Sequence, residues 1–175
     1  MTEEFLDIFD ENNEPTGESV PRSKAHAEGL WHRTVHIYVF RKNDGNVEFL
    51  VHLRSKFKDL YPNHWDTRVG GHIKSGVSLE DSAIGEIREE IGLDVGMKDL
   101  VKGEWYKGGK FPNQEFIQTF FFEYKGGLND LTFNDGEVQE AKWMKVEDIK
   151  KSIINNPEQW GGGIATFTRM CDFLA

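Results

Sequence analysis

The sequence predicts an α/β or α+β sandwich built on a mixed β-sheet. Three observations lead to this class. Short segments rich in β-branched and aromatic residues recur along the chain, separated by turns that contain glycine, proline or asparagine. Longer segments carry apolar residues at helical spacing, one near the centre and two near the end. The 175 residues suffice for a substantial core, so we expect a single domain over residues 1–175.

The first third of the chain is predicted to hold a short strand, a turn and a hairpin. Residues 6–9 form the strand, and the NNEPTG that follows has turn chemistry throughout. The segment VPRSKAHAEGLWHR, residues 20–33, is interpreted as an irregular polar connection. Strands over 34–41 and 47–54 then form a hairpin through KNDGN, because an Asp-Gly pair suits a tight turn between strands.

The segment Leu79–Ile91 is the clearest helix in the sequence. Ser78 is a good N-cap, and Asp81, three residues later, completes a weak capping box. Gly92 is placed to end the helix in the left-handed conformation. The helical period gathers four apolar side chains into one arc, which predicts the face that packs on the sheet: Ala83, Ile84, Ile87 and Ile91.

The remaining elements complete a mixed α and β order. They are a polar loop over 56–63, a short strand over 65–69, strands over 100–106 and 115–124, a short strand over 141–144, and closing helices over 146–155 and 164–174. One central helix and two closing helices can cover the two faces of a sheet, which agrees with the predicted sandwich.

The composition excludes several classes of protein. The formal net charge of −9 argues against general binding to a nucleic-acid backbone, which needs a basic face. No apolar run approaches the roughly 20 residues of a membrane span, and the acidic start MTEEFLDIFDE is not a secretory signal. Cys171 is the single cysteine, which excludes an internal disulfide and fits a reducing compartment. We therefore expect a cytoplasmic protein whose partners include no nucleic-acid polymer and no membrane.

Three glutamates lie beside the apolar face of the central helix. Glu86, Glu89 and Glu90 have the spacings i, i+3 and i+4, which bring side chains together on a helix surface. Such carboxylates repel one another, and a hard divalent cation such as Mg²⁺, which prefers oxygen ligands, would turn that repulsion into binding. An EIREE run alone is typical of a solvated helix face. Here, however, a glycine pair precedes the helix, and a backbone carbonyl near Gly71 offers a further ligand.

The stretch from Gly71 to Leu93 resembles the Nudix box. Gly71 is followed by five residues, position 77, seven further residues and then Gly-Glu-Ile-Arg-Glu-Glu-Ile-Gly-Leu. Seven of the nine fixed positions of the box match, and the departures are Val77 in place of glutamate and Gly85 in place of arginine. The resemblance implies one Nudix domain, with its box-like loop and helix over 71–93, folded as a Nudix-type α/β/α sandwich around a mixed β-sheet.

What the resemblance implies for function is metal-dependent hydrolysis of a small-molecule diphosphate. The bond cleaved would be a phosphoanhydride in a nucleoside diphosphate linked to another group, or in a similar organic diphosphate. Glu86, Glu89, Glu90 and the carbonyl of Gly71 are the implied ligands of Mg²⁺ or Mn²⁺, and Glu89 and Glu90 are also implied catalytic residues. Glu137, in the loop NDGEVQE, is a candidate base, with a solvated loop acid as the alternative.

The wider sequence is similar to the branch that includes isopentenyl-diphosphate isomerase. The similar segments are DIFDENNEPTGE, WDTRVGGH and NDGEVQEAKWMKVEDI. The isomerase uses a cysteine just before its Gly-His pair, and this chain has Gly70 there, which carries no group that could transfer a proton. Isomerase activity is therefore not expected. Glu115, His32 and His72 resemble metal-site positions of the isomerase, with lining of the cleft as the alternative role.

Binding of substrate phosphates requires positive charge. We expect Arg54, Lys56 and Arg68 near the mouth of the cleft, with Glu115 as a further substrate-binding residue. Lys58 is a further basic candidate, and each basic residue has a solvated surface role as its alternative. Trp65, Trp105 and Phe111 could stack on a base, although packing roles suit them better. Exposed aromatic residues also allow a homodimer without requiring one.

The two departures from the box bear on how firmly the glutamates are held. The missing arginine at Gly85 removes a charge-assisted partner, and glycine costs a helix about 1 kcal/mol relative to alanine. Arg88 is a substitute only indirectly, because it projects away from Glu89. Neither departure removes a direct ligand, so we expect a hydrolase weakened by about 10–100-fold. The alternative is a catalytically silent Nudix fold that binds a nucleotide or a phosphorylated ligand.

Overall fold

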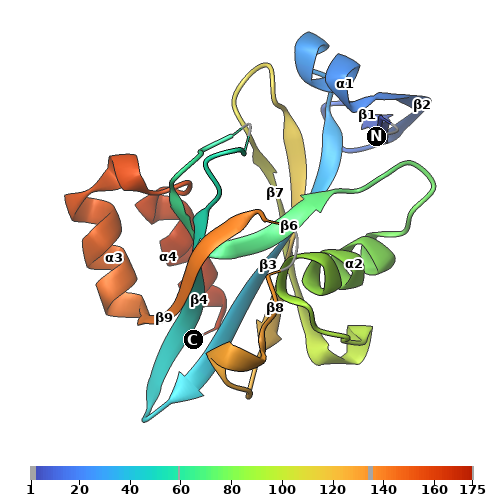
Figure 1. Cartoon of the computed structure of the whole chain (residues 1–175). Helices are drawn as coiled ribbons and strands as arrows, with labels where there is room; N and C mark the ends of the chain where they lie inside the picture. The colour runs from blue at the N-terminus through green and yellow to red at the C-terminus, as the bar shows by residue number, and fades with distance from the viewer. Residues whose placement is uncertain (1–2, 59, 134–135, 175) are drawn as a thin grey trace.

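A computed structural model describes residues 3–58, 60–133 and 136–174, and its elements are labelled in Figure 1. The strands are β1 Phe5–Phe9, β2 Pro15–Pro21, β3 His32–Asn43, β4 Asn46–Arg54, β5 Trp65–Asp66, β6 Arg68–His72, β7 Leu100–Gly108, β8 Glu115–Glu123 and β9 Val138–Lys145. The helices are α1 Arg22–Glu28, α2 Leu79–Ile91, α3 Val146–Asn155 and α4 Ile164–Phe173. Short 3₁₀ turns lie at Met97–Asp99, Leu128–Asp130 and Pro157–Gln159.

The main sheet is mixed and has seven strands, which confirms the predicted α+β class. Its order is β5-β4-β3-β8-β7, with β6 paired to β3 and β9 paired to β4. β3 runs antiparallel to β4 and β6 but parallel to β8. β3 is long enough to pair with β6 along its first half and with β4 along its second, so β6 lies beside the residues that begin β3.

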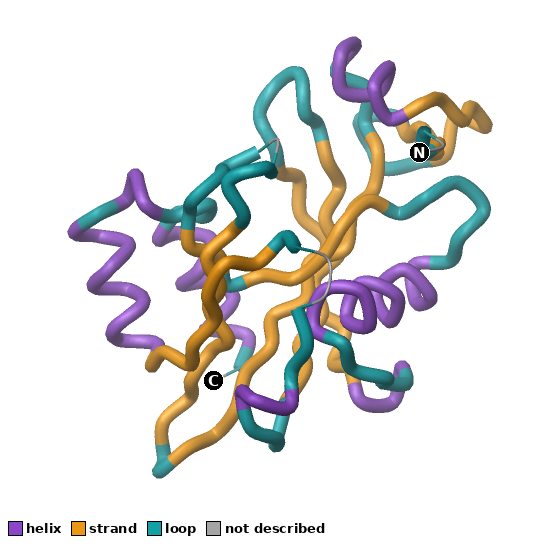
Figure 2. Tube along the Cα trace, viewed as in Figure 1, coloured by secondary structure: helices purple, strands orange, loops and turns teal. Residues whose placement is uncertain are grey.

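Two apolar clusters fill the two faces of this sheet. Side chains alternate between the faces along β3, so that Val35 and Ile37 pack with Ile87 of α2. Tyr38, on the other face, packs with Phe167 of α4 and with residues of α3. Figures 1 and 2 show this division, with α2 on one side of the sheet and α3 and α4 on the other. The predicted apolar face of α2 is confirmed: three of its members are fully buried and Ile84 is partly buried.

Most elements agree with the prediction to within a few residues. The bounds of α2 and α3 are as predicted, the Ser78 hydroxyl accepts the Asp81 N–H at 3.0 Å, and Gly92 ends α2 in the left-handed region. The Asp44–Gly45 turn of the hairpin has positive φ at both residues. The predicted strand over 65–69 is instead two strands, β5 and β6, and the strand over 141–144 extends to become β9.

The prediction of an irregular connection before β3 is wrong. Residues 15–21 form β2, which pairs with β1 in a separate small sheet, and residues 22–28 form α1. β2 is mostly exposed and buries only Val20, so it shows no alternating pattern. α1 has seven residues and buries only Ala25, which is too short for a helical period to be recognised. Leu6 and Ile8 of β1 pack with Val20 of β2 and Ala25 of α1 in a small core of their own.

The helices of the described part of the chain are short. In the ranges given above, none is both long and apolar enough to cross a membrane.

Candidate metal centres and substrate cleft

The candidate site is built on β6, the strand that ends with Gly70, Gly71 and His72. Gly70 has φ of +153°, and a Cβ there would collide with the carbonyl oxygen of Val35 on β3. A Cβ at Gly71 would collide with the carboxylate of Glu86 on α2. Glycine at both positions therefore lets the backbone of β6 approach its neighbours closely. The backbone at Gly70 leaves no room for the cysteine of an isomerase.

Two of the predicted glutamates face this strand. The Gly70 N–H donates to a carboxylate oxygen of Glu90 at 3.2 Å, and Glu90 is 8% exposed. Glu86 lies against Gly71, and its burial, followed by the charge of Glu89, raises its pKa to about 7. Glu89 is exposed to solvent. The helix thus holds two carboxylates against β6 and one toward solvent, which is an all-oxygen set of the kind that Mg²⁺ and Mn²⁺ prefer.

Two charged side chains of the Nudix box are missing around this helix, at positions 77 and 85. Val77 is 41% exposed in the loop before α2. A Cβ at Gly85 would meet nothing within 4 Å, so the space that an arginine would enter is open. Arg88 is exposed and pairs with Asp94 at 2.7 Å. Arg88 is therefore committed to a different carboxylate and does not replace the missing arginine.

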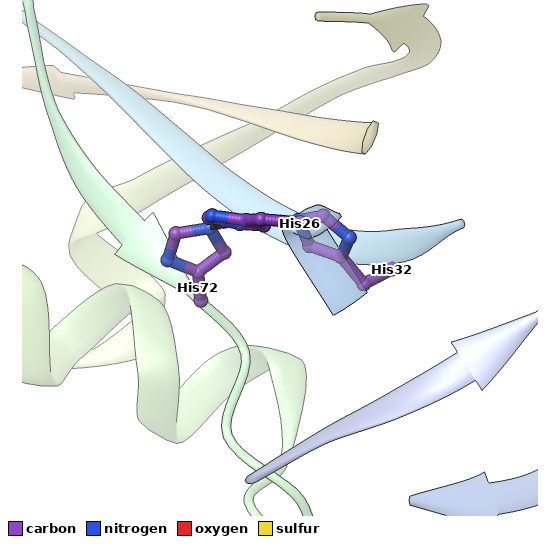
Figure 3. A group of neighbouring side chains, drawn as sticks. All are labelled: His26, His32 and His72. Atoms are coloured by element: carbon purple, nitrogen blue, oxygen red, sulfur yellow. Dashed lines mark hydrogen bonds between the residues drawn. The ribbon is translucent and has the colours of Figure 1, made fainter. Parts of the chain in front are cut away.

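A second cluster of ligand-type side chains lies on the other side of β6. His26 of α1, His32 of β3 and His72 of β6 gather their rings together (Figure 3), and one ring nitrogen of each lies within 4.8 Å of the others. The Nε2 atoms of His26 and His72 are 3.1 Å apart. Glu115 of β8 completes the group, with Oε1 3.9 Å from His32 Nε2 and 3.7 Å from His72 Nε2. Throughout the described ranges, Glu86, Glu89 and Glu90 form no group this tight.

Two histidines of this cluster favour the neutral form that can bind metals. Burial lowers the pKa of His72 to about 2, helped by His32 and Arg22, and burial also lowers the pKa of His32. The neutral imidazoles of His32 and His72 therefore predominate at pH 7. The Nδ1–H of His32 donates to the Leu30 carbonyl at 2.8 Å, which leaves Nε2 as the unprotonated nitrogen. That buried Nε2 accepts no hydrogen bond from any described residue, as expected of an atom placed to ligate a cation.

Sequence reasoning noted three members of this cluster and missed the fourth. His32, His72 and Glu115 resemble metal-site positions of the isomerase, with lining of the cleft as the alternative role, whereas His26 was not noted, because residues 20–33 were interpreted as irregular. α1 carries His26 over the start of β3. A helical interpretation of RSKAHAE, ended by Gly29 in the left-handed region, would have revealed it.

A cleft of about 790 Å³ opens on the α4 face of the sheet, within the size range of ligand-binding sites. Gly70, Gly71 and His72 line it, so β6 borders the glutamates, the histidines and the cleft. Three predicted substrate residues also line it: Arg54, Arg68 and Glu115. Its other walls include Thr34, His36, Tyr106 and the glycines of 161–163.

The two arginines of the cleft are held in place by hydrogen bonds. Arg68 donates to both carboxylate oxygens of Asp66, at 2.7 and 2.8 Å, and to the Gly161 carbonyl at 3.2 Å. The charge of Arg68 holds the pKa of Asp66 well below its usual range against the effect of burial. Arg54 donates twice to the Leu60 carbonyl, at 3.2 and 3.0 Å. Both guanidinium groups are thereby oriented at the cleft wall.

The lysines lie differently from what was expected. Lys56 does not line the cleft, and its Nζ lies 4.9 Å above the exposed ring of Phe57. Lys58 instead forms an ion pair with Glu137, the candidate base. The charge of Lys58 partly opposes the rise in the pKa of Glu86. The Lys58–Glu137 pair is therefore close enough to α2 to interact electrostatically with Glu86.

The three aromatic residues considered for base stacking lie outside the cleft lining. Trp65 packs against the core of the α4 face and has the Nζ of Lys142 3.7 Å above its ring. Trp105 has the guanidinium of Arg33 5.1 Å from its ring. Phe111 is 75% exposed and lies next to Gly29. Packing and rim positions were the preferred interpretation for all three.

Comparison with known proteins identifies the family. Residues 30–161 match the model of the NUDIX domain. The chain is 34% identical over 160 residues to an uncharacterized Nudix hydrolase of Clostridium acetobutylicum, covering 89% of this chain and 76% of that protein. It is 23% identical over 163 residues to an isopentenyl-diphosphate Delta-isomerase of Aliivibrio fischeri, covering 89% and 87%.

A solved structure supports the same conclusion for the fold. The crystal structure of DR0079 from Deinococcus radiodurans superposes with a TM-score of 0.70 at 23% identity, over 96% of this chain and 99% of that one. The sandwich, the box on α2 and the family match agree with one another. The chain belongs to the NUDIX domain family, among the Nudix hydrolases.

Proposed function

We propose that this chain is a metal-dependent hydrolase that cleaves a phosphoanhydride bond of a nucleoside diphosphate linked to another group, or of a similar organic diphosphate. Nudix hydrolases as a family act on diphosphate-containing compounds, and this chain belongs to them. The observation that carries the proposal is the pair of carboxylates, Glu86 and Glu90, packed against Gly71 and Gly70 where β6 borders a cationic cleft.

The residues of α2 fit a hard divalent cation. Glu86, Glu89, Glu90 and Gly71 would hold Mg²⁺ or Mn²⁺, since carboxylate oxygens repel one another without a cation. Burial, followed by repulsion from Glu89, raises the pKa of Glu86 to about 7. When bound, such a cation would neutralise the negative charge of the diphosphate oxygens. The three glutamates are spaced by one helix, and Gly71 comes from the neighbouring strand β6.

The protein's own side chains supply the other requirements. Arg54 and Arg68 are oriented at the cleft wall, where their N–H groups can donate to diphosphate oxygens. Glu89 and Glu137 are the carboxylates that we propose as acceptors of a proton from the attacking water. Glu89 is exposed, and Glu137 forms an ion pair with Lys58. Glu90 is the positioning partner of Gly70.

The test is turnover of a diphosphate panel by the purified protein. The panel contains nucleoside diphosphate sugars, dinucleotides, oxidised nucleotides and isoprenoid diphosphates, each with Mg²⁺, with Mn²⁺ and with chelator. We expect metal-dependent cleavage of at least one compound, and loss of that cleavage in Glu90→Gln. Glu80→Gln is the matched control, because Glu80 is also on α2 but pairs with Lys102 at 3.8 Å, away from the cluster.

The competing function is a silent Nudix fold that binds a nucleotide or a phosphorylated ligand. The open space at Gly85 and the commitment of Arg88 to Asp94 favour it. Absence of turnover across the whole panel, together with measurable binding of a panel compound, would establish this alternative and overturn the hydrolase. Isomerisation is not proposed, because the backbone at Gly70 has no room for a cysteine.

A further inference from the structure

The cleft has the opposite charge to the rest of the molecule. The chain carries a formal net charge of −9. Five basic residues and two acidic residues line the cleft, an excess of three positive charges: Arg54, Arg68, Lys107, Lys110 and Arg169 against Asp66 and Glu115. The two histidines of the cleft wall, His36 and His72, add no charge, because burial lowers their pKa values to about 3 and about 2. A positive cleft in an acidic protein selects anionic ligands.

Most of these cations already have partners. Arg68 is neutralised by Asp66, and Arg54 is bonded to the Leu60 carbonyl and lies 3.9 Å from Asp66. The Nζ of Lys107 lies 5.2 Å above the ring of Trp31, and Lys110 is exposed in the loop after β7. Among residues 3–58, 60–133 and 136–174, Arg169 of α4 has no carboxylate partner either, and it differs from Lys107 and Lys110 in its planar set of N–H donors.

The exposed side chain of Arg169 contacts an aromatic ring of the cleft. Its guanidinium carbon lies 4.3 Å from the centre of the Tyr106 ring. The Tyr106 hydroxyl is in turn 3.2 Å from Nδ1 of His36. Stacking on a ring fixes the plane of a guanidinium and leaves its N–H groups at the edge for oxygen acceptors. Arg169 is therefore a cation of the cleft wall whose guanidinium lies over the Tyr106 ring.

The surroundings of Arg169 have room for a ligand group. A Cβ at Gly162 or Gly163, which precede α4 and line the cleft, would meet nothing within 4 Å. The volume of about 790 Å³ exceeds what one diphosphate needs. Arg169 lies on α4 and the glutamates lie on α2, on opposite sides of the sheet (Figure 1). A group at Arg169 is therefore separate from the phosphoanhydride bond at α2.

We propose that the cleft selects diphosphate compounds that carry a second phosphate, a phosphate ester on the organic part, and that Arg169 is the residue that recognises it. This specificity rests on the proposed hydrolase function, because the diphosphate is assigned to the glutamates of α2 and to Arg54 and Arg68, which leaves Arg169 for a second group. A bidentate guanidinium contact to a phosphate ester is strong and directional, whereas a lysine would provide only a point charge.

The experiment compares two pairs of compounds that differ by one phosphate ester: NADPH with NADH, and coenzyme A with dephospho-coenzyme A. Binding is measured by calorimetry in chelator, so that no turnover occurs. We expect the phosphorylated member of a pair to bind about tenfold more tightly, a difference of about 1.4 kcal/mol. Arg169→Gln should remove the difference and leave the binding of NADH and dephospho-coenzyme A unchanged.

Two further variants make the result specific. Arg88→Gln removes an exposed arginine outside the cleft and should retain the full difference. Arg169→Lys keeps the charge without the planar donor set and should retain only part of it. Equal binding within both pairs, no binding by either phosphorylated compound, or equal weakening of both members by Arg169→Gln would each overturn the proposal.

The same design separates this inference from the proposed function. Binding in chelator depends on the cleft alone, whereas turnover with Mg²⁺ depends on the glutamates. A phosphate-dependent difference in binding without any turnover on the diphosphate panel would retain the role of Arg169 and reject the hydrolase. Turnover without a phosphate-dependent difference would do the reverse.

Discussion

The glutamates of α2 and the histidine cluster border the same strand, β6, but are assembled in different ways. Glu86, Glu89 and Glu90 come from two turns of one helix, where the helical period alone sets their spacing. The histidines come from α1, β3 and β6, and Glu115 comes from β8. The first group offers oxygen ligands of which Glu89 is exposed, and the second offers nitrogen ligands that are buried at His32 and partly buried at His26 and His72. A local cluster is encoded by spacing, whereas a dispersed cluster depends on the whole fold.

The largest expected effect tests whether the two clusters are independent. Glu90→Gln removes a carboxylate charge from α2 and should lower turnover with Mg²⁺ at least 100-fold, since it removes a proposed ligand. The same variant should bind Co²⁺ at the histidines as the parent protein does, measured by the visible absorption of the bound ion. Loss of both properties in one variant would show that the clusters act as one centre.

The second prediction concerns the affinity of the histidine cluster. Three imidazoles and a carboxylate suit Zn²⁺ or Co²⁺, so we expect one high-affinity ion per chain at this cluster, apart from the ion at α2, in a calorimetric titration of metal-free protein. His72→Asn should weaken that binding about 100-fold, because it removes one of the nitrogen ligands. His64→Asn is the control, because His64 bonds to the Pro62 carbonyl outside the cluster. Unchanged affinity in His72→Asn, or equal weakening by both variants, would contradict the assignment.

The sequence predicts the region built from one local segment better than the region built from several distant segments. The helix Leu79–Ile91, its caps and its three glutamates were predicted with the observed bounds, because capping residues and a helical period are local signals. The β3–β4 hairpin was predicted for the same reason, from Asp44–Gly45. α1 was missed, because seven residues that bury one alanine give no period, and His26 was missed with it.

The hydrogen-bond and ion-pair partners of individual side chains were harder still to predict. Arg68 and Lys56 are both basic residues near the predicted cleft, yet Arg68 is bonded to Asp66 and Gly161 at its wall while Lys56 lies outside it. Asp66 is two residues before Arg68, and nothing in that spacing reveals a buried bidentate pair. The unpaired state of Arg169 among the described residues depends on the packing of α4, which sequence spacing does not specify.

A smaller effect is expected in the pH dependence of stability without metal. The pKa of Glu86 is about 7 in the folded protein and about 4.5 as an ordinary carboxyl. The folded state therefore binds more protons than the unfolded state between these values, so the free energy of unfolding falls as pH rises from about 4.5 to 7. Glu86→Gln should remove this fall and be more stable than the parent at pH 8 in chelator.

Urea unfolding of both proteins at pH 5 and pH 8 measures this difference. Addition of Mg²⁺ at pH 8 should stabilise the parent and have a smaller effect on Glu86→Gln, because the cation offsets the buried charge. An equal response of the two proteins to pH would mean that Glu86 is solvated and is not held against Gly71.

The smallest effect tests the departure at Gly85, which distinguishes the glutamate cluster from a complete Nudix box. Glycine in a helix interior costs about 1 kcal/mol relative to alanine, and the space around Gly85 is open, so Gly85→Ala should raise the free energy of unfolding by about that amount. Alanine adds no donor, and turnover should be unchanged.

Gly85→Arg gains the same helical stability and also supplies a guanidinium beside Glu86 and Glu89, so its turnover should rise about tenfold. If Gly85→Arg and Gly85→Ala have the same turnover, the arginine of the box is not what limits this protein. Any weakness of the site would then have to come from Val77 or from the exposed position of Glu89, because these are the remaining differences in how the carboxylates are supported.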